Sequence, residues 1–123
     1  MKRRTFVLAA SVCLFAAVAL PAIRAIAQPG TVTEDNLDQA IANAKTPADH
    51  QAIAAFFQQQ ADEAKKKAAL HREWAATYRK MAIPKPAQMA EMCDGIARMW
   101  DRIAADDEKL AKEHSQMAKK VGS

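Results

Sequence analysis

Three histidines, a cysteine and several methionines fall on segments of this chain whose pattern is helical. Imidazole, thiolate and thioether groups bind soft and borderline metal ions, and together they suit copper, especially its reduced form, better than magnesium or calcium. The candidate ligands are His50, His71, Cys93, His114, Met92 and Met117. No His-x-x-His, His-x-x-x-His or Cys-x-x-Cys spacing occurs, so two helices would have to share any ion. The alternative interpretation is that these side chains are ordinary packing residues or polar rims of a helical core.

Two long helices are predicted to carry these residues. Thr46 is a suitable N-cap, Pro47 a suitable first helical residue, and Asp49 an acid near the positive end of the helix dipole. No Gly or Pro follows until Pro84, where the first long helix must end. The second long helix is predicted from about Pro86 to Lys120.

Apolar side chains recur along both segments at steps of three and four, which is the spacing of one helix face. On the first helix this stripe is Ile53, Phe57, Ala61, Ala64, Ala68, His71, Ala75 and Tyr78, with a second apolar edge at Phe56, Leu70, Trp74 and Met81. On the second helix it is Met89, Cys93, Ile96, Trp100, Ile103, Asp107, Leu110, His114, Met117 and Val121.

These patterns predict an all-α fold, because no strand pattern occurs. We expect an antiparallel hairpin of two long helices plus a short N-terminal helix over residues 34–45, capped by Thr33. The domain organisation is a signal peptide at 1–27, a lead-in with the short helix at 28–46, and the hairpin at 47–121. A lone hairpin leaves part of its apolar surface exposed to water. The short helix is expected to cover part of it, and a partner chain, either a second copy or another protein, to cover the rest and complete a four-helix bundle.

The hairpin also sets which ligands can meet. The two long helices align at an offset of 43 residues, which superposes His71 on His114 and His50 on Cys93. Both an ancient duplication and a coincidence of helical period explain this match. An antiparallel turn near Pro84 places His50 near His114, and His71 near Cys93, each pair offset by roughly 6–8 Å along the axis. That separation is long for direct contact but allows two side chains to converge on one ion.

Smaller features carry expectations of their own. Gly95 is expected to make room for the indole of Trp74, and the inward carboxylate of Asp107 to pair with Lys66. Ion pairs four residues apart are expected to support the exposed faces of both helices. These pairs are Asp62 with Lys66, Glu63 with Lys67, Asp94 with Arg98, and Glu108 with Lys112.

Residues 1–27 have the pattern of a signal peptide: a basic head, an apolar run and the small-residue end Ala25-Ile26-Ala27. Four of the 18 Lys and Arg residues lie there and none of the Asp and Glu, so the mature chain has 14 basic and 14 acidic residues. That balance gives no reason to expect nucleic-acid binding. The apolar run is too short for a stable membrane anchor. Since Cys13 leaves with the leader, Cys93 is the only thiol of the mature protein.

Two stretches resemble known proteins. Arg3-Arg4-Thr5-Phe6-Val7 resembles the twin-arginine export motif, with the general secretory route as the alternative. Thr46 to His50 and His114 to Ala118 resemble segments of small exported all-α proteins of Gram-negative bacteria, many of them uncharacterised. The resemblance implies a periplasmic or secreted protein and brings no established activity.

Catalysis finds no support, because there is neither a Ser placed near a His and an acid nor a Gly-rich phosphate loop. The leading hypothesis is a non-enzymatic periplasmic interaction module that associates with itself or with a protein partner. The alternative, from a different class, is a periplasmic metal-binding or cofactor-binding protein that uses the His, Met and Cys residues of the hairpin, with copper as the suited metal.

Overall fold

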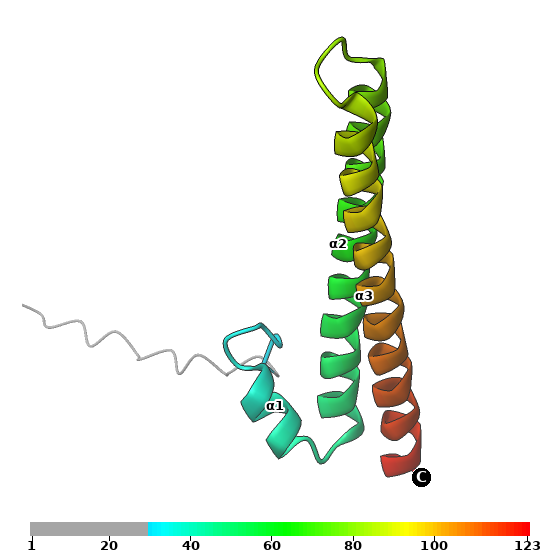
Figure 1. Cartoon of the computed structure of the whole chain (residues 1–123). Coiled ribbons are helices and arrows are strands. Elements are labelled where there is room, and N and C mark those ends of the chain that lie inside the picture. Colours follow the sequence, from blue (N-terminus) through cyan, green and yellow to red (C-terminus); the bar gives the residue numbers. More distant parts are fainter. Residues whose placement is uncertain (1–29) are drawn as a thin grey trace, which may run out of the picture.

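The computed structural model describes residues 30–123 and contains three helices, shown in Figure 1: α1 (Leu37–Asn43), α2 (Pro47–Lys80) and α3 (Pro86–Val121). Helices α2 and α3 pack against each other as an antiparallel hairpin, and α1 contacts only α2. The predicted all-α hairpin with a short N-terminal helix is confirmed. The predicted signal peptide at 1–27, with its twin-arginine-like motif and Cys13, lies outside the described residues.

The start of α2 follows from three residues. The hydroxyl of Thr46 accepts a hydrogen bond from the Asp49 N–H at 3.1 Å, and the Asp49 carboxylate accepts from the Thr46 N–H at 2.9 Å. The same carboxylate accepts from the Lys45 N–H at 3.0 Å. These backbone donors, Lys45 first, lower the pKa of Asp49. The reciprocal bonds form a capping box around Pro47, and they confirm the predicted start of the helix.

Helix α1 begins at Leu37, three residues later than expected, and Thr33 does not cap it. The side chain of Asn36 accepts a hydrogen bond from the Thr33 N–H at 2.8 Å and donates to the Thr31 carbonyl at 3.1 Å. A short amide side chain that bonds to nearby backbone in this way offers the chain an alternative to helix. The residues before Leu37 therefore form a turn.

The reversal between the long helices is set by its prolines. Helix α2 ends at Lys80, where the Met81 N–H donates to the Tyr78 carbonyl at 3.1 Å. Lys85 then takes the left-handed conformation (φ 58°, ψ 47°), and Pro86 is the first residue of α3. Because Pro disfavours the right-handed helical conformation in the residue before it, α3 cannot extend back past Lys85.

Most of the buried residues of α2 and α3 are alanines. Ten of the thirteen buried hydrophobic residues among positions 30–123 are alanines, and the largest fully buried side chain is Ile53. We call the alanine seam the two sets that recur every seven residues: Ala54, Ala61, Ala68 and Ala75 on α2, and Ala90, Ala97, Ala104, Ala111 and Ala118 on α3. A seven-residue repeat keeps one face of each helix on its partner, and small side chains there let the two backbones approach closely.

The seam corrects the predicted inner stripe of α3. Of the ten residues expected to face α2, only Cys93 is buried, and five of them are 38–48% exposed: Met89, Ile103, Leu110, Met117 and Val121. The prediction followed the largest apolar side chains, whereas close approach of two helices requires the smallest. The large side chains are therefore displaced to one side of the seam.

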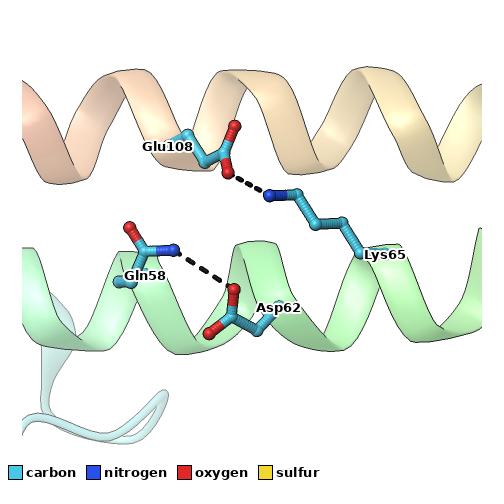
Figure 2. A network of polar contacts seen from close by, with 4 residues as sticks. All are labelled: Gln58, Asp62, Lys65 and Glu108. Atoms are coloured by element: carbon cyan, nitrogen blue, oxygen red, sulfur yellow. Dashed lines mark hydrogen bonds and ion pairs between the residues drawn. The ribbon is translucent and has the colours of Figure 1, made fainter.

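The other side of the seam carries a row of ion pairs between the helices, which we call the charged flank. Figure 2 shows one of them, in which Lys65 of α2 reaches across to Glu108 of α3. The pairs are Lys65 with Glu108, Arg72 with Asp101, and Arg79 with Asp94. Each partner lies four residues after a seam alanine, so the row follows the same seven-residue repeat.

The charged flank replaces the two ion pairs that were predicted within α3, and the two predicted within α2 do not form among the described residues. Asp94 pairs with Arg79 of the facing helix rather than with Arg98, and Glu108 with Lys65 rather than with Lys112. Asp62 instead accepts a hydrogen bond from Gln58 at 3.2 Å within α2, also drawn in Figure 2.

No helix in the described part of the chain is long and apolar enough to cross a bilayer.

Candidate functional site

Two of the predicted ligands meet at the open end of the hairpin. His50 lies in the first turn of α2 and His114 near the end of α3, and their Nδ1 atoms are 3.2 Å apart. The ring centroids are 5.4 Å apart with 34° between the ring planes, so the Nδ1 edges of the rings face each other. The predicted pairing is correct, but the expectation that the two side chains lie too far apart for contact is wrong.

Apolar surroundings keep this pair partly out of water. The ring of Phe57, about two turns after His50 on α2, stacks on His114 with centroids 6.1 Å apart. Burial, and secondarily the nearby His50, lower the pKa of His114. A neutral His114 retains a lone pair on one ring nitrogen, which can accept a hydrogen bond from His50 or bind a metal ion.

The second predicted pair is not joined in the same way. The imidazole of His71 packs edge-on against Trp74, with centroids 4.7 Å apart at 78°. Its Nδ1 atom is buried, and no group between residues 30 and 123 forms a hydrogen bond with it. Cys93 is buried against Ala75 and Ala90, with Tyr78 packed beside them. The imidazole of His71 is therefore packed against the ring of Trp74.

The two candidate methionines lie at the surface of α3. Met92 is 58% exposed and Met117 is 41% exposed. Positions 30–123 contain no group of three or more His, Cys, Asp or Glu residues that could hold a metal ion. The six candidate ligands are thus spread along the hairpin, with His50 and His114 as the pair in contact. Metal binding by any of them stays a prediction.

A shallow hollow opens near the turn end of the hairpin. Its volume is about 360 Å³, and it is lined by Trp74, Thr77, Tyr78, Met81 and Cys93. The lining is mostly apolar, and Cys93 is its only thiol. Such a hollow fits an apolar side chain better than a charged group, because it offers few polar partners.

The hollow belongs to a longer apolar surface that sequence reasoning treated as core. Five residues of α3 that each precede a seam alanine form an unbroken apolar row, and two residues of α2 extend it. We call these residues the apolar flank: Met89, Ile96, Ile103, Leu110 and Met117 of α3, with Trp74 and Met81 of α2. At 3.6 residues per turn the row lies about 100° to one side of the seam, and the charged flank about 40° to the other. The seven-residue spacing of the alanines is the signal that would have separated the two.

One cation and one acid border this surface. The Nζ atom of Lys67 lies 4.3 Å from the centre of the Trp100 ring, in a cation–π contact.

Asp107 forms no ion pair among residues 30–123, so the expected pairing with Lys66 is wrong. Burial, followed by the charge of Asp106, raises the pKa of Asp107. This carboxyl group therefore binds its proton more tightly than an exposed aspartate does.

Gly95 does not serve the apolar flank. A Cβ atom built on Gly95 would meet only the Arg98 guanidinium, at 3.8 Å, which is ordinary van der Waals contact. The expected close approach of Trp74 is wrong.

Comparison with protein-family models, with curated proteins and with solved structures finds no match for this chain.

Proposed function

We propose that this chain is a non-enzymatic helical assembly module, in which two copies pair along the apolar flank to form a four-helix bundle. The observation that carries the proposal is the row on α3, in which large apolar side chains recur every seven residues. Four of its five side chains, those of Met89, Ile103, Leu110 and Met117, are 38–43% exposed. Such a row is the seam of a second helix pair in a bundle. The predicted leader supports action outside the cytoplasmic membrane, in the periplasm or as a secreted protein.

The occupant that suits this row is a second copy of the chain. In the order Met89, Ile96, Ile103, Leu110, Met117, the side chains have nearly the same sequence of shapes in both directions. Two α3 helices related by a two-fold axis at Ile103 would place Met89 opposite the partner's Met117, and Ile96 opposite the partner's Leu110. Self-complementarity of this kind is what a two-fold interface requires.

The number of exposed apolar side chains also suits an interface. Leu70, Met92 and Met99 border the apolar flank and are 42–58% exposed. With them, nine large apolar side chains are each 38–58% exposed, on a surface that could contribute to a standard interface of ~800 Å² per partner. The core inside one hairpin is mostly alanine and so supplies little burial per residue. A second copy would cover the large side chains that the alanine seam displaces.

Sedimentation equilibrium at tens of micromolar tests the proposal, since an association of ~8 kcal/mol has a dissociation constant of about 1 μM. We expect a dimer for the unmodified chain and a monomer for Ile103→Lys, because a lysine at the two-fold axis would be buried against its own copy. Ala105→Lys is the matched control, since exposed Ala105 lies on the other side of Ala104, away from the apolar flank. It should remain a dimer.

A cross-linking experiment locates the axis. Under mild oxidation Ile103→Cys should give a disulfide-linked dimer, because the two-fold axis brings the two copies of this position within disulfide distance. Ala105→Cys should not, and buried Cys93 is common to both variants. An unmodified chain that stays monomeric at these concentrations would refute the proposal, as would equal behaviour of the two lysine variants.

A further inference from the structure

The open end of the hairpin, far from the turn, holds the pair of imidazoles described above. Two ring nitrogens from different helices are held 3.2 Å apart, on an element whose first turn is fixed by the capping box at Thr46. This pair takes no part in the apolar flank or in the proposed assembly. We propose that His50 and His114 together bind a late first-row transition metal ion through their Nδ1 atoms, and that the ion joins the start of α2 to the end of α3.

The distance between the nitrogens fits such an ion. Zinc lies ~2.0–2.1 Å from an imidazole nitrogen, so two nitrogens 3.2 Å apart subtend an angle of about 100° at a shared ion. This is near the tetrahedral angle of ~109° that zinc and reduced copper adopt. A small rotation of each ring turns the facing Nδ1 edges toward the ion. Water would complete the coordination, because the described residues supply no third His, Cys, Asp or Glu at a metal site.

An aromatic neighbour helps to hold the pair in place for a metal ion. The stacked ring of Phe57 restricts the orientation of His114. Imidazole suits copper, nickel and zinc, and among divalent ions copper is bound most tightly by a given nitrogen site. We therefore expect copper to bind more tightly than zinc.

Calorimetric titration of the untagged protein with Cu²⁺ and with Zn²⁺ tests the inference. We expect one ion per chain, and roughly tenfold or greater loss of affinity in His50→Gln and in His114→Gln. His71→Gln is the matched control and should bind as the unmodified protein does, because His71 packs against Trp74. Circular dichroism of each variant checks that the helices are retained.

Two further readouts keep the inference testable if a variant unfolds. The electron paramagnetic resonance spectrum of the unmodified protein loaded with Cu²⁺ should show coupling to imidazole nitrogens. A hundredfold excess of metal over the dissociation constant should raise the melting temperature by several degrees. Absence of imidazole coupling would overturn the inference. So would metal uptake that falls in His71→Gln or Cys93→Ala and persists in the His50 and His114 variants.

Discussion

The charged flank and the apolar flank lie on the same two helices, on either side of one alanine seam and with one seven-residue repeat. On the charged flank each group finds its partner within the hairpin, as Arg72 does with Asp101. On the apolar flank the hairpin covers the large side chains only in part, and Leu110 remains 43% exposed. The contrast shows that the hairpin satisfies one side of its helix pair and leaves the other partly uncovered, which is the side that the proposed association would complete.

The two flanks also differ in energy. The ion pairs are between side chains that are 27–54% exposed, and such pairs each contribute ~0.2–1 kcal/mol. Apolar surface removed from water contributes ~25 cal/mol per Å², and the proposed interface would cover the flanks of both copies, against an association cost of ~4–15 kcal/mol. The proposed assembly therefore depends on the apolar flank.

The largest effect on folding is expected at the seam that separates the flanks. Ala104→Leu should lower the free energy of unfolding by about 1–3 kcal/mol, because a larger side chain would force the backbones of α2 and α3 apart. Urea unfolding at one fixed protein concentration measures the change. Ala105→Leu, on the exposed neighbour, should change stability far less. Equal stability of the two variants would contradict close packing at Ala104.

A smaller effect, of opposite sign, is expected outside both flanks. Gly95→Ala should raise the free energy of unfolding by about 0.8–1 kcal/mol, because alanine is the better helix former and its Cβ has room. Gly122→Ala is a useful contrast, since a Cβ there would lie 3.3 Å from the Pro47 ring. A lower melting temperature for Gly95→Ala would show that a neighbouring side chain packs over this position.

The smallest effect is expected on the charged flank. Arg72→Glu should cost less than about 1 kcal/mol, because both partners are exposed and water screens them. In 1 M salt, where the screening length is ~3 Å, the cost should largely disappear. Asp101→Arg added to Arg72→Glu should restore most of the loss at low salt. A cost that persists in high salt would mean that Arg72 contributes by packing rather than by charge.

Local chemistry was sufficient to predict where the long helices begin and why. Thr46 and Asp49 form their capping box within four residues, and Pro86 begins α3 for reasons confined to its own ring. The approach of His50 to His114 was also predictable in outline, since the turn position fixes an antiparallel register. These outcomes depend on neighbours in sequence or on the length of the helices, and both are visible without a structure.

Only the tertiary structure decided which side chains face each other. Helical period alone favoured Ile103 and Leu110 as core, whereas the approach of two backbones selected Ala104 and Ala111 beside them. Asp94 and Glu108, which were predicted to pair within α3, pair across the seam, because the facing helix brings an opposite charge into reach. His71 packs against Trp74, although it superposes on His114 at the offset of 43 residues. Each outcome is a choice among competing partners, and the partners become known only when the helices are packed together.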